Sequence, residues 1–258
     1  MRATRGGVEI HYDVEGAGRP VLLVHGVGAN LRSWDPIAER LARRHRVARL
    51  DLRGHGQSSR IETCTLDDFI DDVLLVQDAL GMERAHLVGF SLGGMIAQAF
   101  VLAHPERVDR LALISAVAGR TAEERASLRA RARKVREEGI ASVVGAAEDR
   151  WFTEEFRRDH PEVVARRIAE LKANDQRSYA AAYTVFAESD VGSRLAGIRH
   201  RTLVVTGEHD VGSNTRMARF MHESIPGSTL RILPHLKHSV LIEAPQVIAN
   251  LLEDFLAD

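Results

Sequence analysis

The hexapeptide Gly89-Phe90-Ser91-Leu92-Gly93-Gly94 follows an apolar run at residues 86–88 and precedes a helical pattern of small and apolar residues at 95–102. Strand, tight turn and helix in this order are the setting of a nucleophile elbow, where a serine is held in a strained turn. Glycines beside Ser91 fit this setting, because bulky side chains cannot be placed at such a turn. We predict that Ser91 is a nucleophile; the alternative is a chance match in a glycine-rich turn.

Strands and helices alternate on both sides of this turn. Apolar runs that end in glycine-rich or polar loops predict buried strands, and an alternating segment at 8–14 predicts a half-exposed antiparallel strand. Strand–helix alternation is typical of an α/β protein with a mostly parallel sheet and helices on both faces. The further strands are expected at residues 21–24, 46–52, 108–116, 201–207 and 229–233, and helices at 65–81, 213–225 and 245–256.

Residues 119–197 interrupt this alternation and contain no strand signal. Helical patterns are found instead at 121–138, 140–149, 161–173 and 176–188, and the charged runs 123–125 and 131–134 are expected to form solvated helix faces. An all-helical insertion between strands of a parallel sheet predicts a lid over the edge where such sheets bind ligands. We expect a core of residues 1–118 and 198–258, with a helical cap at 119–197.

A serine nucleophile needs a base, and the base needs an acid that orients it. Asp210 follows the strand at 201–207 and is the candidate acid; its alternative role is to cap the next helix, and Glu208 is a weaker candidate. His238 follows the strand at 229–233 and is favoured as the base over His235, which lies close to the strand end. The order serine, acid, histidine along the chain is that of enzymes with this type of elbow.

Two backbone N–H groups are needed to stabilise the oxyanion of an acyl-transfer reaction. Leu92 directly follows the nucleophile and supplies one candidate donor. Val27, in the loop that begins with His25-Gly26 after the strand at 21–24, supplies the other. His25 itself is interpreted as a structural residue of that loop.

Aromatic side chains are concentrated in the insertion and predict an apolar pocket wall. For any one of them, the alternative is that it only packs the cap against the sheet. The expected pocket residues are Trp34, Trp151, Phe152, Tyr183 and Phe186.

Composition excludes several classes of function. The chain has 258 residues, 45% of them hydrophobic, a net charge of −1 and a single cysteine, Cys64, so neither a nucleic-acid partner nor a disulfide framework is expected. No His or Cys spacing predicts a metal site, and no cofactor is expected. The first seven residues lack the apolar core of a signal peptide, and no apolar run spans a membrane, so a cytoplasmic protein is expected. The oligomeric state is left open.

These motifs together resemble the α/β-hydrolase superfamily over nearly the whole chain. The resemblance rests on the loop 25–28, the segment Asp51-Leu52-Arg53-Gly54-His55-Gly56-Gln57-Ser58, the elbow, Gly207-Glu208-His209-Asp210 and His238. Within the superfamily the chain is similar to 3-oxoadipate enol-lactonases and related small esterases and lactonases, and the segments 150–156 and 160–164 support that subgroup. The resemblance implies hydrolysis of a small-molecule ester or lactone through an acyl-enzyme.

Other functions on the same scaffold remain open. A hydrolase of carbon–carbon bonds in ring-cleavage products, or a cofactor-free perhydrolase of the haloperoxidase type, would use the same three residues. Haloalkane dehalogenases and epoxide hydrolases need a carboxylate nucleophile, and Ser91 argues against both. A ligand receptor built on a hydrolase scaffold is the alternative from a different class of function.

Overall fold

An eight-stranded sheet runs through the structure, a computed structural model that describes residues 1–257. The strand order is β1-β2-β4-β3-β5-β6-β7-β8. Strands β3 to β8 pair in parallel, whereas β2 is antiparallel to β4 and to β1, so the predicted mostly parallel sheet is confirmed. The short edge strand β1 was not anticipated. The bounds are β1 Arg2–Arg5, β2 Val8–Glu15, β3 Arg19–Val24, β4 His45–Leu50, β5 Ala85–Phe90, β6 Val108–Ile114, β7 Arg201–Gly207 and β8 Thr229–Leu233.

Both faces of the sheet are covered by helices, as predicted. Side chains of a strand alternate between faces, so Leu22 and Val24 belong to one apolar cluster and Val21 and Leu23 to the other. Helices on the first face are α2 (Leu66–Ala79), α3 (Leu92–Ala103) and α9 (Thr215–Ser224); those on the second are α1 (Asp35–Leu41) and α11 (Pro245–Leu256).

Short helical turns join these elements. Turn η1 (Leu31–Trp34) leads into α1, η2 (Pro105–Arg107) leads into β6, and α10 (Val240–Glu243) precedes α11. The helix expected at 213–225 begins at Thr215, because the side chain of Asn214 accepts a hydrogen bond from Met217 N at 3.0 Å and caps it.

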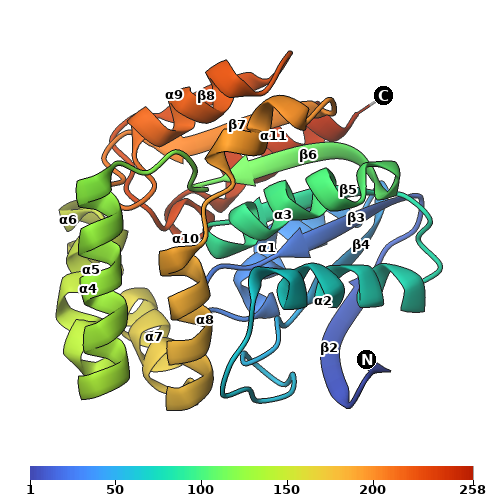
Figure 1. Cartoon of the computed structure of the whole chain (residues 1–258). Helices are drawn as coiled ribbons and strands as arrows, with labels where there is room; N and C mark the ends of the chain where they lie inside the picture. Colours follow the sequence, from blue (N-terminus) through green and yellow to red (C-terminus); the bar gives the residue numbers. More distant parts are fainter. Residues whose placement is uncertain (258) are drawn as a thin grey trace.

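Between β6 and β7 the chain forms a group of helices, here called the cap helices, with no strand. In Figure 1 they gather beyond the carboxyl ends of the parallel strands. Two residues anchor them to the rest of the chain. Ser178 Oγ donates to Ile61 O and accepts from Ile61 N, each at 3.0 Å. Thr153 donates from its N–H and its hydroxyl to the carboxylate of Glu243. Their bounds are α4 Ala122–Glu138, η3 Ile140–Val143, α5 Val144–Trp151, α6 Glu154–Asp159, α7 Pro161–Lys172, α8 Gln176–Glu188 and η4 Gly192–Gly197.

Within residues 1–257, none of the helices combines the length and apolar character needed to cross a lipid bilayer.

Candidate active site

Ser91 lies between β5 and α3 with a backbone conformation that serine rarely adopts. Its φ is 54° and its ψ is −114°, and its N–H donates to Ile114 O on the neighbouring strand at 2.9 Å. A serine persists in such a conformation only when its surroundings enforce it, as they do in a nucleophile elbow. Helix α3 begins at the next residue, so its N-terminal N–H groups lie beside the serine and favour negative charge there.

The glycines that flank Ser91 are required by close backbone packing. A Cβ atom added to Gly89 would lie 2.2 Å from Gly93 O. A Cβ atom added to Gly93 would lie 2.2 Å from Val24 O. A side chain at Gly89 would therefore push α3 away from β5, and one at Gly93 would push α3 away from the end of β3. Either change would shift Ser91.

Asp210 and His238 form a hydrogen-bonded pair at the ends of two neighbouring strands. Asp210 follows β7, His238 follows β8, and His238 Nδ1 lies 2.7 Å from Asp210 Oδ2. With Nδ1 donating to the carboxylate, Nε2 is the ring nitrogen that can accept a proton. Ser91, Asp210 and His238 all line one cavity.

The second oxygen of Asp210 has a different set of partners. Oδ1 accepts hydrogen bonds from Gly212 N at 2.9 Å and Ser213 N at 2.8 Å, so the carboxylate also shapes the turn before α9. Burial by itself would raise the pKa of this carboxyl group. The charge and hydrogen bond of His238, with the two N–H donors, outweigh burial and lower the pKa, so Asp210 is ionised at neutral pH.

Glu208 and His235, the weaker candidates for acid and base, lie together elsewhere. Both are exposed, neither lines the cavity, and Glu208 Oε2 accepts a hydrogen bond from His235 N at 2.9 Å. The structure thus separates this pair from the pair formed by Asp210 and His238.

The loop after β3 brings Val27 to the cavity, and Leu92 is the first residue of α3. The fully buried His25 holds this loop: its Nδ1 bonds Gly26 O at 2.7 Å and its Nε2 accepts from Leu52 N at 3.1 Å. Burial lowers the pKa of His25, and this bonding pattern is that of a neutral ring protonated on Nδ1. Its contacts are those of a structural residue that ties the β3 loop to the β4 loop.

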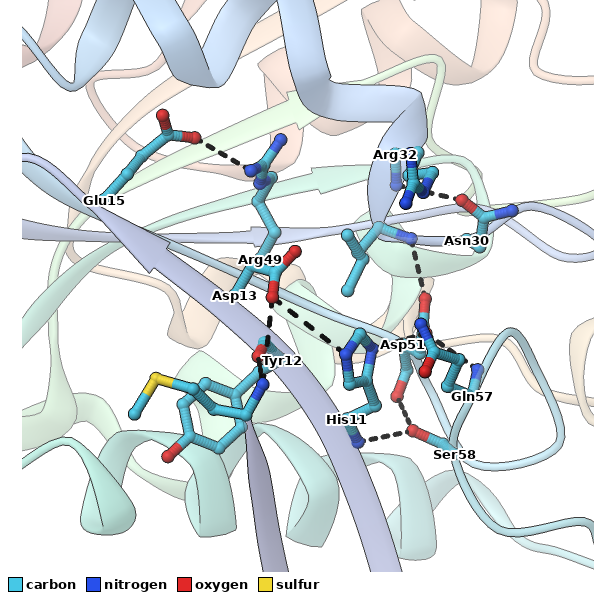
Figure 2. A network of polar contacts seen from close by, with 12 residues as sticks. His11, Tyr12, Asp13, Glu15, Asn30, Arg32, Arg49, Asp51, Gln57 and Ser58 are labelled. Atoms are coloured by element: carbon cyan, nitrogen blue, oxygen red, sulfur yellow. Dashed lines mark hydrogen bonds and ion pairs between the residues drawn. The ribbon is translucent and has the colours of Figure 1, made fainter.

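Asp51 supports the same region from outside the cavity. Its Oδ1 accepts from Leu31 N at 2.8 Å, and its Oδ2 accepts from Gln57 N at 2.9 Å and bonds His11 Nδ1 at 3.0 Å (Figure 2). Ser58 Oγ donates to the Asp51 carbonyl at 2.6 Å. This buried carboxylate therefore joins β2, the turn η1 and the loop after β4 into one scaffold beside the loop that carries Val27.

The cavity has a volume of about 360 Å³ and extends from Ser91 into the cap helices. Among the aromatic residues expected in the pocket, Trp151, Tyr183 and Phe186 line it. Trp34 and Phe152 do not, which corrects the expectation for both. Trp34 is fully buried with α1 and α11 on the second face of the sheet, and Phe152 is fully buried in the other apolar cluster.

The cap helices also contribute cationic side chains that the sequence analysis missed. Arg131 belongs to a charged run that was expected to face solvent, yet it lines the cavity and its Nη1 lies 3.3 Å from Tyr183 Oη. An arginine within a charged run of a helix gives no sequence signal that separates a cavity wall from a solvated face. The cavity arginines are Arg120, Arg131, Arg150 and Arg167.

Arg167 on α7 is a buried member of this set. Its guanidinium stacks on Trp151, with Cζ 4.8 Å from the ring centroid, and its side chain is 10% exposed. Its Nη1 has no hydrogen-bond partner among residues 1–257, and Glu170 Oε2 lies 3.9 Å away. Burial lowers the pKa of Arg167, which means that its charge is poorly compensated within the protein.

Arg120, another arginine that lines the cavity, shows the same imbalance. Its Nη1 donates to Ser189 O at 2.9 Å, and its Cζ lies 4.7 Å from the ring centroid of Phe186. Its Nη2 is buried without a hydrogen-bond partner among the residues that the structure describes. Burial lowers the pKa of this guanidinium to about 10.

The family described as the alpha/beta hydrolase fold matches residues 19–245, and the chain belongs to that family. Two 3-oxoadipate enol-lactonases of Acinetobacter baylyi are 31% and 29% identical to it, over 95% and 91% of this chain and 92% and 87% of their own lengths. The crystal structure of the enol-lactonase from Burkholderia xenovorans LB400 superimposes with a TM-score of 0.94, at 29% identity and with full coverage of both chains. The chain is thus an α/β-hydrolase that is similar to enol-lactonases.

Proposed function

We propose that this protein is a serine hydrolase that cleaves a carboxylic ester or lactone through an acyl-enzyme. The observation that carries the proposal is the arrangement around one cavity of a strained Ser91 and a hydrogen-bonded pair of Asp210 and His238. The similarity to enol-lactonases supports the choice of an ester or lactone bond over the carbon–carbon and peracid alternatives.

In the proposed reaction, His238 Nε2 takes the proton of Ser91 Oγ while Oγ attacks the carbonyl carbon. The negative charge that develops on the carbonyl oxygen is stabilised by the N–H groups of Val27 and Leu92. When the tetrahedral intermediate collapses, the carbon–oxygen bond breaks and His238 returns the proton to the leaving oxygen. In a lactone that oxygen stays attached to the acyl chain.

Deacylation repeats these steps with water. His238 accepts a proton from the water as its oxygen attacks the acyl carbon, and Ser91 Oγ leaves with the proton that His238 returns. Asp210 remains ionised throughout and stabilises the charged imidazole. The products are a carboxylic acid and the hydroxyl form of the leaving group.

The charge of the cavity narrows the substrate class. Arg120 and Arg167 each keep a buried guanidinium nitrogen without a hydrogen-bond partner in residues 1–257. Of the cap carboxylates at the cavity, Glu123 is exposed and Glu124 is engaged by Thr121 N and Asn214. A buried, undercompensated guanidinium gains most from a carboxylate ligand. We therefore propose that the substrate carries an anionic group remote from the bond that is cleaved.

The test compares kcat/KM for matched substrates with and without that charge. Purified protein would be assayed with p-nitrophenyl esters and lactones bearing a free terminal carboxylate, and with their methyl-esterified counterparts. We expect the free acids to be preferred by about tenfold or more, because a charge-assisted hydrogen bond contributes roughly 1.5–3 kcal/mol. Arg167→Gln should remove much of that preference, whereas Arg166→Gln, which changes the exposed neighbour on α7, should retain it.

The same panel, extended by a ring-cleavage dienoate and by an assay for peracid formation, separates the two parts of the proposal. Equal turnover of free acids and methyl esters would contradict the anionic substrate but not ester hydrolysis. A preference for free acids that Arg167→Gln leaves unchanged would contradict the role of Arg167. Turnover of a ring-cleavage dienoate or formation of peracid, without hydrolysis of any ester or lactone, would contradict the reaction itself.

A further inference from the structure

Glu208, His209 and His235 form an exposed cluster outside the cavity. One potential ligand atom from each residue lies within 4.8 Å of the others. The centroids of the two imidazole rings are 6.5 Å apart. Sequence spacing could not reveal this set, because His235 is 26 positions after His209 and reaches it only through the pairing of β7 with β8.

The backbone under the cluster is fixed by hydrogen bonds between two loops. Glu208 N donates to Leu233 O at 2.9 Å, and His209 N donates to Leu236 O at 2.8 Å. A Cβ atom on Gly207 would lie 2.2 Å from Lys237 O, so the loops also touch directly. The three side chains thus project from a preformed base, while their exposure leaves them free to rotate toward a common ligand.

His235 has a φ of 63°, a left-handed conformation that is uncommon for a histidine. Its N–H donates to Glu208 Oε2, and this hydrogen bond lowers the pKa of Glu208. The cluster therefore combines one carboxylate with two imidazole rings. The nearby Lys237 directs its ammonium to Asp149 O at 2.7 Å, on the cap helices.

We propose that Glu208, His209 and His235 bind a zinc ion, with water as the fourth ligand. Two imidazole nitrogens and one carboxylate oxygen form a donor set that suits zinc and disfavours magnesium or calcium. Tetrahedral bonds of about 2.0–2.1 Å place ligand atoms roughly 3.4 Å apart, a closure that exposed side chains can make by small rotations. The proposal is independent of the substrate and reaction proposed above.

The location gives the ion a consequence for the catalytic loops. Asp210 follows His209 directly, and His238 lies three residues after His235. An ion held by both histidines would therefore clamp the loop of the acid to the loop of the base. It would act as a stabilising clip, without contact with the substrate.

The proposal is tested by titrating ZnCl₂ alone into protein that has been stripped with a chelator, using calorimetry and thermal unfolding. The variants are His209→Gln, His235→Asn and the double variant; asparagine is chosen because it tolerates a left-handed backbone. His222→Gln is the matched control, since it removes an exposed histidine of α9 outside the cluster. Equal melting temperatures without zinc check that every variant folds.

We expect one zinc per wild-type chain and a rise in melting temperature of about 5 °C at a hundredfold excess over the Kd. Each single variant should weaken binding by about tenfold or more. The double variant should abolish it, and His222→Gln should bind as wild type does. Absence of saturable 1:1 binding to wild type, or retention of binding in the double variant, would overturn the proposal. Zinc that binds at His238 instead of at the cluster would still bind to the double variant.

Discussion

The two oxygens of Asp210 have separate tasks. Oδ2 bonds His238, while Oδ1 accepts two N–H groups of the turn before α9. The alternative role considered from the sequence was that Asp210 caps the next helix; Asp210 instead bonds the turn that precedes that helix. The cap of α9 itself is Asn214.

Replacement of Asp210 separates its electrostatic role from its structural one. Asp210→Asn keeps the shape of the side chain but favours the wrong tautomer of His238, so kcat should fall by about 10⁴. Glu208→Gln, which alters a carboxylate outside the cavity, should change kcat by less than about twofold. The measurement is kcat on one activated ester, with the melting temperature as a check on folding. A severe loss in Glu208→Gln with a mild one in Asp210→Asn would show that the acid is Glu208.

At the residue scale, sequence patterns could predict which candidate residues follow a strand and so lie at one edge of the sheet. Ser91, Asp210 and His238 each follow a parallel strand, and parallel strands in one sheet end at the same edge. Sequence patterns could not predict whether an apolar side chain faces the core or the cavity. Trp34 has the helical spacing of a core residue and of a pocket residue alike, and only the packing of α1 under the sheet distinguishes them.

Helix α5 illustrates how closely the two kinds of aromatic residue can lie along the chain. Trp151 ends the helix and lines the cavity, whereas the next residue, Phe152, is fully buried and stacks on Phe156 with ring centroids 5.7 Å apart. The sequence analysis predicted both Trp151 and Phe152 as pocket residues. Adjacent residues leave a helix end in different directions, which a pattern of residue types cannot resolve.

This pair allows the role of the cap helices in substrate choice to be tested. Trp151→Ala should shift the ratio of kcat/KM between a short and a long acyl substrate by about 1–3 kcal/mol, because a pocket contact is lost. Phe152→Ala should leave the ratio unchanged and lower the free energy of unfolding by about 3–5 kcal/mol. If neither Trp151→Ala nor Tyr183→Ala moves the ratio, residues 119–197 do not act as the substrate-selecting cap proposed here.

Three buried histidines are held neutral; the ring centroids of His25 and His55 lie 5.1 Å apart, and His86 lies on β5. Burial lowers the pKa of His25, that of His55 to about 3 and that of His86 to about 4. A base whose pKa is lowered on folding contributes stability above its unfolded pKa of 6.5. That stability is lost as the pH falls from 6.5 toward the folded value, because the unfolded chain then binds more protons.

The folded protein should therefore be acid-labile in a defined window. As the pH falls below 6.5, each such histidine lowers the free energy of unfolding by up to about 1.4 kcal/mol per pH unit. Asp72 opposes this below pH 6, because burial raises its pKa to about 6. We expect a net loss of roughly 2–4 kcal/mol between pH 6.5 and pH 5, measured by urea unfolding. His55→Gln should flatten the dependence, and a wild-type curve that is level or rises in this window would contradict the assignment.

The central claim for the whole molecule is that the fold makes Ser91 the nucleophile. The tryptic peptide of residues 85–107 contains Ser91 as its sole hydroxyl-bearing side chain, which makes a covalent product there unambiguous. The protein would be treated with diethyl p-nitrophenyl phosphate, and intact and peptide masses would be recorded beside those of Ser91→Ala. We predict one diethylphosphoryl group per chain, on this peptide, with one equivalent of p-nitrophenolate released, and no labelling of Ser91→Ala. Labelling at another residue, or equal labelling of Ser91→Ala, would contradict the claim.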